Sequence, residues 1–297
     1  MAARLIVNPN ASLVTPELVS EVEAALAPVE TVVSERRGHA STLAEESSRG
    51  CERIYVLAGD GGFNEAVNGM NGGVPVGFIP GGGSSVLPRA LGLPRDPVEC
   101  ARALARSHAV RRISLGRANG RRFTFSAGLG LAAETVRAVD RAGRRDGRRP
   151  GDVAFVRALL RIVVARGGRF GPQMTVLGRG RVAFALVANC DPFTYVSRFP
   201  VHVAPEADFE LGLDLVAPER VRASDWPRLL ASVLAHGTHT RDARIHHLHD
   251  VDEIRIECDA PAALQVDGED LGDVATAVFE AERAALPVLV SGTTSRV

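Results

Sequence analysis

The sequence predicts a two-domain α/β protein, with a parallel-sheet α/β domain followed by a mainly β, sandwich-like domain. The chain has 297 residues, about twice the length of a typical domain of roughly 150 residues. Up to about residue 115, short apolar runs alternate with helical patterns, which is typical of βαβ units and a parallel sheet. Strand-like runs separated by turns predominate after that point. We therefore expect domains at 1–115 and 116–297, with the final segment able to pack back on the first.

The elements of the first domain follow from capping residues and apolar spacing. Leu5–Val7 is an apolar run typical of a buried strand. Thr15-Pro16 supplies an N-cap followed by proline at the first helical position, and apolar residues then recur at helical spacing through Leu26. The elements expected after these are strands at Thr31–Val33, Ile54–Leu57 and Val76–Ile79, and helices at Ala40–Ser48, Asn64–Met70, Val86–Leu91 and Pro97–Ser107.

The second domain is predicted from shorter apolar runs bounded by turn residues. The strands expected here are Arg122–Ser126, Met174–Leu177, Val182–Ala188, Leu213–Val216, Ile254–Cys258 and Ala275–Phe279, and the helices are Asp152–Ala165 and Ser224–Ala235. Between them, Arg141–Pro150 holds five arginines beside glycines. We interpret this segment as a loop.

The charge composition limits the classes of function. Thirty-five basic residues balance 35 acidic residues, so the chain lacks the positive field of a general nucleic-acid binder. There is no lysine in the sequence, which excludes Schiff-base chemistry and a P-loop lysine. The four cysteines lie far apart in the sequence. They indicate reduced thiols in a cytoplasmic protein.

Two glycine-rich turns are the strongest candidates for a ligand site. Gly59-Asp60-Gly61-Gly62 follows a predicted strand and opens a helix, and Gly81-Gly82-Gly83-Ser84 follows the next strand. Glycines let backbone N–H groups approach a phosphate, and a helix N-terminus favours an anion. Asp60 could hold a metal ion that bridges phosphates. The alternative is that these are ordinary βα turns in which Asp60 acts as a cap.

The two turns belong to a longer ordered set of motifs. In chain order these are Asn8-Pro9, Gly38-His39-Ala40, Gly59-Asp60-Gly61 with Asn64-Glu65, the stretch from Pro80 to Pro94, and Val266-Asp267-Gly268-Glu269. The set resembles the diacylglycerol kinase catalytic-domain family, which includes bacterial lipid kinases and the sphingosine and ceramide kinases. The resemblance covers nearly the whole chain, from Ile6 to about Val290.

The resemblance implies an ATP-dependent lipid kinase whose second domain helps to receive the lipid. The nucleotide-side residues that it implies are Asn8, Ser34, Gly59, Asp60, Gly61, Glu65, Gly81, Gly82, Gly83 and Ser84. Asp60 would lie near a Mg²⁺ ion that arrives with the nucleotide. Asp267 matches the family's general base, which would take the proton of the lipid hydroxyl, and Glu269 is its neighbour.

Several positions depart from the family pattern. Ala58 and Gly62 stand where the family has glycine and threonine, and Gly82 to Val86 lacks a hydroxyl, an amide and a carboxylate that are usual there. Ala132 stands where an aspartate is common. Glu210 replaces an aspartate that holds a structural Mg²⁺ in some members. Backbone contacts to phosphate would survive these changes and side-chain contacts would not, so weak or altered kinase activity is also expected.

Three functions stay open at this point. The leading one is a lipid kinase that transfers the γ-phosphate of ATP to a hydroxyl such as that of diacylglycerol. The others are an NAD kinase-like phosphotransferase, which shares the Gly-Asp-Gly turn, and a nucleotide- or lipid-binding protein that has lost catalysis. We expect ATP and Mg²⁺ as cofactors, a lipid substrate at the membrane surface and no nucleic-acid partner. The expected location is cytoplasmic with reversible membrane association, aided by Arg144, Arg145, Arg148 and Arg149, and a homodimer stays open.

Overall fold

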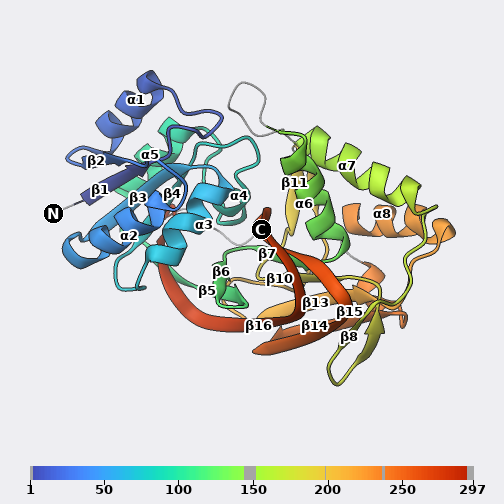
Figure 1. The fold of residues 1–297 in the computed structure, drawn as a ribbon. Helices are drawn as coiled ribbons and strands as arrows, with labels where there is room; N and C mark the ends of the chain where they lie inside the picture. The colour runs from blue at the N-terminus through green and yellow to red at the C-terminus, as the bar shows by residue number, and fades with distance from the viewer. Residues whose placement is uncertain (1–2, 144–151, 198, 236–237, 293–297) are drawn as a thin grey trace. The chain divides into compact units, whose positions relative to one another are not determined.

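The computed structural model describes residues 3–143, 152–197, 199–235 and 238–292. By its internal contacts the chain divides into two units, Met1–Ile113 with Ala284–Val297, and Ser114–Arg283. The predicted fold class is confirmed, because the first unit holds a parallel sheet with helices and the second is mostly antiparallel β (Figure 1). The predicted domain boundary at residue 115 stays a prediction. The arginines of the 144–149 segment, which we expected to contact lipid, lie outside the described residues.

The first unit is built on a parallel sheet with the strand order β16-β4-β3-β1-β2 (Figure 1). Its strands are β1 (Ala3–Val7), β2 (Glu30–Val33), β3 (Arg53–Ala58) and β4 (Val76–Pro80). The last residues of β16 (Glu269–Leu289) complete it, because Val288 pairs in parallel with Val76 of β4. All these strands therefore end at the same edge of the sheet.

Five helices cover the two faces of this sheet. They are α1 (Pro16–Leu26), α2 (His39–Gly50), α3 (Asp60–Gly69), α4 (Val86–Ala90) and α5 (Pro97–Arg106). Helix α1 packs against α5 and α2 packs against α3, and right-handed crossovers place these two pairs on opposite faces (Figure 1). The predicted N-cap at Thr15 is confirmed, since its side chain accepts a hydrogen bond from Leu18 N at 3.2 Å.

Helix α3 begins at Asp60, although the sequence pattern placed its start at Asn64. The difference arises because glycine has a low helix propensity, so Gly61 and Gly62 were expected to lie in the preceding turn. In the structure they form the first turn of the helix, where the backbone N–H groups have no partner within the helix. The glycine-rich motif therefore carries the helix N-terminus itself.

The second unit is an antiparallel sheet with the order β14-β13-β10-β7-β15-β16. Its strands are β7 (Ser126–Leu129), β10 (Ala185–Ala188), β13 (Leu213–Pro218), β14 (Ile245–Val251) and β15 (Glu253–Val266). The shorter strands β5 (Val110–Ala118), β6 (Arg121–Phe123), β8 (Met174–Val176) and β9 (Gly180–Val182) extend it, and β11 (Thr194–Val196) with β12 (Phe199–Val201) forms a separate hairpin. Phe123, Ile256 and Phe279 are among the fully buried residues of its core.

Strand lengths in this unit differ from the predictions. The predicted strand at Ile254–Cys258 belongs to β15, which runs through Pro261 to Val266 with a register shift between Glu257 and Ala262. Pro261 has no backbone N–H to donate, so it interrupts the pairing of β15 with β16 only locally. The predicted strand at Val182–Ala188 is two strands, β9 and β10, because the chain leaves extended pairing between them.

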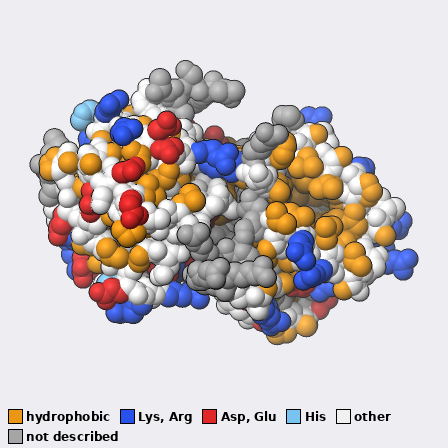
Figure 2. Space-filling model, turned by 90° about the horizontal axis from the view of Figure 1, so that it is seen from above, with side chains coloured by type: hydrophobic (Ala, Val, Ile, Leu, Met, Phe, Trp, Pro, Cys, Tyr) orange, Lys and Arg blue, Asp and Glu red, His pale blue; other side chains and the backbone are white. Residues whose placement is uncertain are grey.

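The second unit also has three helices, α6 (Leu131–Arg141), α7 (Asp152–Ala165) and α8 (Trp226–Leu234). The sequence analysis predicted α7 and α8 but not α6. All three contribute to one apolar cluster, which we call the helical cluster. Its buried members are Leu131, Phe170, Ala183, Phe184 and Val221. Packed against them are Leu159, Ile162 and Val163 of α7 and Trp226 and Leu229 of α8. Figure 2 shows the protein from above, and hydrophobic side chains gather on the surface of the second unit in that view. No helix in the described ranges is long and apolar enough to cross a bilayer.

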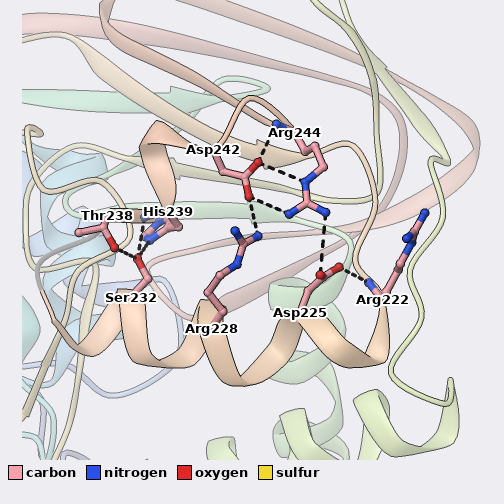
Figure 3. A network of polar contacts seen from close by, with 8 residues as sticks. All are labelled: Arg222, Asp225, Arg228, Ser232, Thr238, His239, Asp242 and Arg244. Atoms are coloured by element: carbon pink, nitrogen blue, oxygen red, sulfur yellow. Dashed lines mark hydrogen bonds and ion pairs between the residues drawn. The ribbon is translucent and has the colours of Figure 1, made fainter.

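A polar network fastens α8 to the segment that follows it (Figure 3). Arg228 of α8 and Arg244 both pair with Asp242, at 2.5 Å and 3.0 Å. Hydrogen bonds from these two guanidinium groups, Arg244 first, hold the pKa of the Asp242 carboxyl well below its usual range. Asp225 accepts a hydrogen bond from Arg222 N at 2.8 Å at the start of the helix. Helix α8 is therefore fixed to the following segment by charge, in addition to the packing of Trp226 and Leu229.

The buried imidazole of His239 completes this network at the other end of α8 (Figure 3). Its Nε2 donates to the carbonyl of Val203 at 2.8 Å, and the Ser232 hydroxyl lies 2.9 Å from Nδ1. A carbonyl oxygen can only accept, so Nε2 carries the proton and Nδ1 is the acceptor in the neutral ring. Burial lowers the pKa of His239 below 6.5, and the bond to Val203 opposes this only in part.

We expect His239 to make the protein less stable in acid. Because its pKa is lower in the folded state, the unfolded chain binds more protons below pH 6.5, and stability is lost as the pH falls through that range. His249 has the opposite sign, since its bond to Asp214 raises its pKa. Urea unfolding should therefore show that the free energy of unfolding falls less between about pH 7.5 and about pH 5.5 in His239→Gln than in the wild type. The exposed His108→Gln control should behave as the wild type does; an equal loss in all three proteins would contradict the assignment.

Candidate functional site

The predicted nucleotide-side residues of the first unit gather at the carboxyl edge of its parallel sheet. Asn8 follows β1, Ser34 follows β2, and the two glycine-rich turns follow β3 and β4. Backbone hydrogen bonds hold the starts of these loops beside one another: Asn8 N donates to Leu57 O at 2.9 Å and Ser34 N donates to Val7 O at 2.8 Å. This is the edge at which open α/β sheets bind ligands.

The two glycine-rich turns touch through their backbones. Gly81 N donates to Ala58 O at 2.7 Å, and a Cβ atom on Gly82 would lie 2.8 Å from the Cα of Gly59. Such a distance is shorter than side-chain carbons tolerate, so glycine is required here for close approach. A Cβ atom on Gly62 would similarly lie 2.7 Å from that of Ala58. The structure thus makes one continuous backbone edge out of the two turns.

The Asp60 carboxylate joins the same two turns. Asp60 is the first residue of α3, and its Oδ1 accepts from Leu87 N at 3.4 Å at the start of α4. Ser85 closes the second turn, because its hydroxyl donates to Gly82 O at 2.8 Å while its own backbone lies in the left-handed region at φ +42°. The cap role considered for Asp60 is therefore present, in the neighbouring turn rather than its own.

The remaining predicted residues lie around this edge with different exposures. Asn8 is half-buried and accepts from Asn10 N at 3.0 Å, and Ser34 is buried. Gly61, Glu65 and Ser84 are half-buried, and Gly83 is exposed. The structure therefore places Asn8, Ser34 and the two glycine-rich turns at one edge of the sheet, and Glu65 on the helix that starts there. Together they offer backbone N–H groups, the N-terminus of the ten-residue helix α3 and two carboxylates, Asp60 and Glu65.

One cation near the second turn escaped the sequence analysis. Arg89 of α4 lies with Nη1 3.5 Å from the carbonyl oxygen of Ser84. Because the chain has no lysine, an arginine within one helical turn after a glycine-rich turn could have been used to predict this cation from the sequence.

The predicted general base lies in the second unit, at the turn between β15 and β16. Val266 pairs with Glu269, which leaves Asp267 and Gly268 as a two-residue hairpin loop. Both have positive φ, +47° and +78°, as expected for an Asp-Gly turn that matches the twist of its strands. The Gly268 amide donates to the Gln265 side chain at 2.8 Å.

The carboxylate of Asp267 is buried and accepts four hydrogen bonds from one short segment. Oδ2 accepts from the backbone N and the hydroxyl of Thr124 at 2.7 and 2.9 Å, and Oδ1 accepts from Phe125 N and Ser126 N at 3.0 and 3.1 Å. Asn189 supports the same segment by donating to Thr124 O at 2.8 Å. Asp267 is only 2% exposed, so the tight turn does not present its carboxylate to solvent. Its side chain fixes the 124–126 segment, because three backbone N–H groups have it as their acceptor.

The acidic residues after Asp267 are paired with arginines. Glu269 lies 3.5 Å from the Arg121 guanidinium. Asp270 forms a two-bond pair with Arg137, at 2.7 and 3.0 Å, and the pair lowers the pKa of Asp270.

Metal sites made by protein side chains alone are absent from the described residues, which contain no group of three or more His, Cys, Asp and Glu side chains placed to hold an ion. The Glu210 residue is exposed, and its backbone N donates to the Asp208 side chain. The structural Mg²⁺ that the resemblance placed at Glu210 stays a prediction. A single carboxylate such as Asp60 is consistent with Mg²⁺ that is carried largely by phosphate oxygens.

Comparisons with known proteins agree with this geometry. Residues 2–118 match the family described as the diacylglycerol kinase catalytic domain. The diacylglycerol kinase of Bacillus subtilis (strain 168) is 30% identical over 141 residues, which are 44% of this chain and 46% of that protein, so the match spans about half of its length.

Two solved structures share the fold over nearly the whole chain. A diacylglycerol kinase from Bacillus anthracis str. Sterne has a TM-score of 0.73 at 18% identity and covers 99% of this chain and 98% of its own. An NAD kinase from Archaeoglobus fulgidus in complex with ATP has a TM-score of 0.51 at 14% identity and covers 98% and 94%. At these identities both likenesses concern the fold.

Gly82→Ala should separate the two glycine-rich turns. The added Cβ atom would lie 2.8 Å from the Gly59 backbone, and such overpacking costs about 1–3 kcal/mol of unfolding free energy. Gly50→Ala is the matched control, since nothing lies within 4 Å of its Cβ position. Urea unfolding should show the loss in Gly82→Ala alone, and two equally stable variants would show that the turns do not touch as described.

Asp267→Asn should destabilise the second unit, in contrast to the expectation from sequence that asparagine leaves the turn intact. If the amide oxygen accepts from Phe125 N and Ser126 N, the amide nitrogen faces Thr124 N, which loses its acceptor. A buried donor without a partner costs about 1–3 kcal/mol. Asp252→Asn, at an exposed ion pair with Arg283, should change stability by less than about 1 kcal/mol. Equal unfolding midpoints for the two variants would rule out the anchoring role of Asp267.

Proposed function

Residues 2–118 match the diacylglycerol kinase catalytic domain, and on that premise we propose that this protein transfers the γ-phosphate of ATP to the hydroxyl of a lipid such as diacylglycerol. The observation that carries the proposal is the continuous backbone edge that Gly59 and Gly82 form at the carboxyl end of the parallel sheet. Phosphoryl transfer needs positioning and charge stabilisation more than covalent chemistry. A backbone edge beside a helix N-terminus supplies both.

The residues present fit a nucleotide with its metal ion. The Gly59–Gly62 and Gly81–Ser84 backbones would hold the phosphates, with Asn8, Ser34 and Glu65 around them. Close packing of Gly82 on Gly59 leaves no side chain between the turns, so phosphate oxygens could reach the N–H groups. Asp60 would help to hold a Mg²⁺ ion that arrives with the nucleotide, and that ion would supply positive charge to neutralise the phosphoryl group.

Asp267 is the residue that we propose takes the proton of the lipid hydroxyl. Three of its hydrogen bonds come from backbone N–H groups, which are fixed in direction. The fourth comes from the Thr124 hydroxyl, which can rotate and release Oδ2. Oδ2 is therefore the oxygen that would receive the proton, while Oδ1 keeps the turn in place. Glu269, beside it, would add negative charge near the acceptor.

A nucleotide- or lipid-binding protein without transfer activity is the second candidate. It is favoured by the full set of hydrogen bonds on Asp267 and by the missing side chains at Gly62 and Ser84-Ser85-Val86. An NAD kinase-like activity is supported by the shared fold alone. Cytoplasmic location, reversible membrane association and a homodimer belong to the same proposal and need their own measurements.

Transfer is tested with γ-labelled ATP, Mg²⁺ and a panel of acceptors that comprises diacylglycerol, a sphingoid base, ceramide, phosphatidylglycerol and NAD. Label in one lipid product, lost in Gly82→Ala and kept in Gly50→Ala, would support the lipid kinase. Label in NAD alone would indicate the NAD kinase-like activity. ATP binding by calorimetry without label in any acceptor would support the non-catalytic protein.

Thr124→Val should distinguish a base from an anchor at Asp267. The change removes one donor from the carboxylate and keeps the backbone bonds, so the carboxylate binds a proton more readily. If Asp267 is the base, the acidic limb of the pH–rate profile moves to higher pH. Thr135→Val is the control, since Thr135 is also buried and donates to Leu131 O at 2.8 Å. If the acidic limbs of the pH–rate profiles are identical in Thr124→Val, Thr135→Val and the wild type, Asp267 is not the group that takes the proton.

A further inference from the structure

Helix α7 of the second unit is apolar on two sides. Its inner side contributes Leu159, Ile162 and Val163 to the helical cluster. Its outer side carries Val153 and Val164, which are 71% and 74% exposed, with Leu160 between them at helical spacing. A helix that is apolar all round is normally buried on all sides. In the described residues the outer side of α7 has no such cover.

Helix α8 repeats this pattern on the same cluster. Trp226 and Leu229 pack inward, while Leu230 and Leu234, four residues apart, are 59% and 49% exposed. The β11–β12 hairpin lies between the helices, because β11 contacts α7 and β12 contacts α8. Its Phe199 is 56% exposed. We call the outer residues of α7 and α8, together with Phe199, the apolar face; hydrophobic side chains gather there in Figure 2, with arginines beside them.

The charges on this face have one sign. Arg157 and Arg161 lie on the outer side of α7 and are exposed. Neither makes an ion pair with a carboxylate among the residues that the structure describes. Asp152, the first residue of α7, is the one acidic residue in the two helices. The rest of α7 and all of α8 therefore carry cations without acidic neighbours in the same helix.

We propose that the apolar face docks on an anionic lipid bilayer, with α7 and α8 lying along the surface. The exposed valines and leucines would enter the boundary between head groups and acyl chains, and Arg157 and Arg161 would pair with lipid phosphates. At 14 residues, α7 is too short to span a bilayer and long enough to lie on one. This inference deepens the reversible membrane association included in the proposed function by naming its surface, and its test does not measure phosphoryl transfer.

Charge also decides between a bilayer and a second copy of the chain. A symmetric dimer through this face would bring the arginines of both copies together, with Asp152 at the start of α7 as the one carboxylate that the two helices carry. Like charges without partners oppose association, whereas anionic lipid supplies the missing charge. The membrane is therefore the occupant that the face fits.

Vesicle binding by the full-length chain tests the proposal without ATP or an acceptor lipid. Co-sedimentation is measured with phosphatidylcholine vesicles that do or do not contain phosphatidylglycerol. One double variant, Leu160→Gln with Leu230→Gln, changes the apolar part, and a second, Arg157→Gln with Arg161→Gln, changes the charge. The matched controls are Val33→Gln with Val110→Gln and Arg102→Gln with Arg106→Gln, all exposed positions of the first unit.

We expect the wild type to bind the anionic vesicles and to bind the neutral ones more weakly. Affinity should fall about fivefold for each arginine removed and about tenfold or more for the leucine pair, while both controls bind as the wild type does. The 144–149 arginines are kept in every variant, so they do not account for a difference.

Three results would overturn the proposal. The first is a wild type that fails to sediment with anionic vesicles, and the second is equal binding by the four double variants. The third is a wild-type dimer in analytical ultracentrifugation that the leucine pair converts to a monomer with vesicle binding unchanged. Because no phosphoryl transfer is measured, a negative result here leaves the proposed kinase activity to its own test.

Discussion

The hydrogen bond from the Gly81 amide to the Ala58 carbonyl is the contact on which the candidate nucleotide edge depends. It continues the pairing of β3 and β4 one residue beyond the strands, to the point where both chains turn into their helices. Glycine at 82 then allows the two backbones to meet, because a Cβ atom there would lie 2.8 Å from the Cα of Gly59. The proposed binding of an anion at this edge therefore depends on strand register and on a missing side chain.

This dependence explains why the altered side chains of the glycine-rich turns need not abolish a phosphate site. The departures at Gly62 and at Ser84-Ser85-Val86 remove polar side chains, whereas the main-chain N–H groups stay in place. In the second unit, by contrast, the backbone depends on a side chain, because the carboxylate of Asp267 accepts hydrogen bonds from the backbone of 124–126. A substitution at Asp267 therefore changes the local structure as well as the chemistry.

The sequence predicted the fold class and the edge at which the nucleotide-side residues meet. It could do so because strand-turn-helix repeats fix the edge of a parallel sheet, so that Asn8 and Asp60 reach it from separate strands. It did not predict that Asp60 caps α4 or that Asp267 is buried, since both depend on partners distant in the chain, Leu87 and Thr124.

Other features were missed for local reasons. Helix α6 has an amphipathic pattern that stood among strand-like neighbours. The outer apolar residues of α7 could not be told from core residues by spacing, because a helix that is apolar all round has no single inner side. Only the exposed fraction of residues such as Val164 separates the two.

The path of β16 has a consequence for how this protein can be divided. The strand starts at Glu269 in the second unit and ends at Leu289 in the first, where it covers the edge of β4. The Ser107 hydroxyl and the Ala109 carbonyl fasten Val290 just beyond it. A fragment that stopped after residue 113 would therefore leave β4 as an open edge strand, and such edges pair with other chains. The nucleotide-side unit is contiguous in space but not in sequence, so a circularly permuted chain would isolate it better than a truncated one.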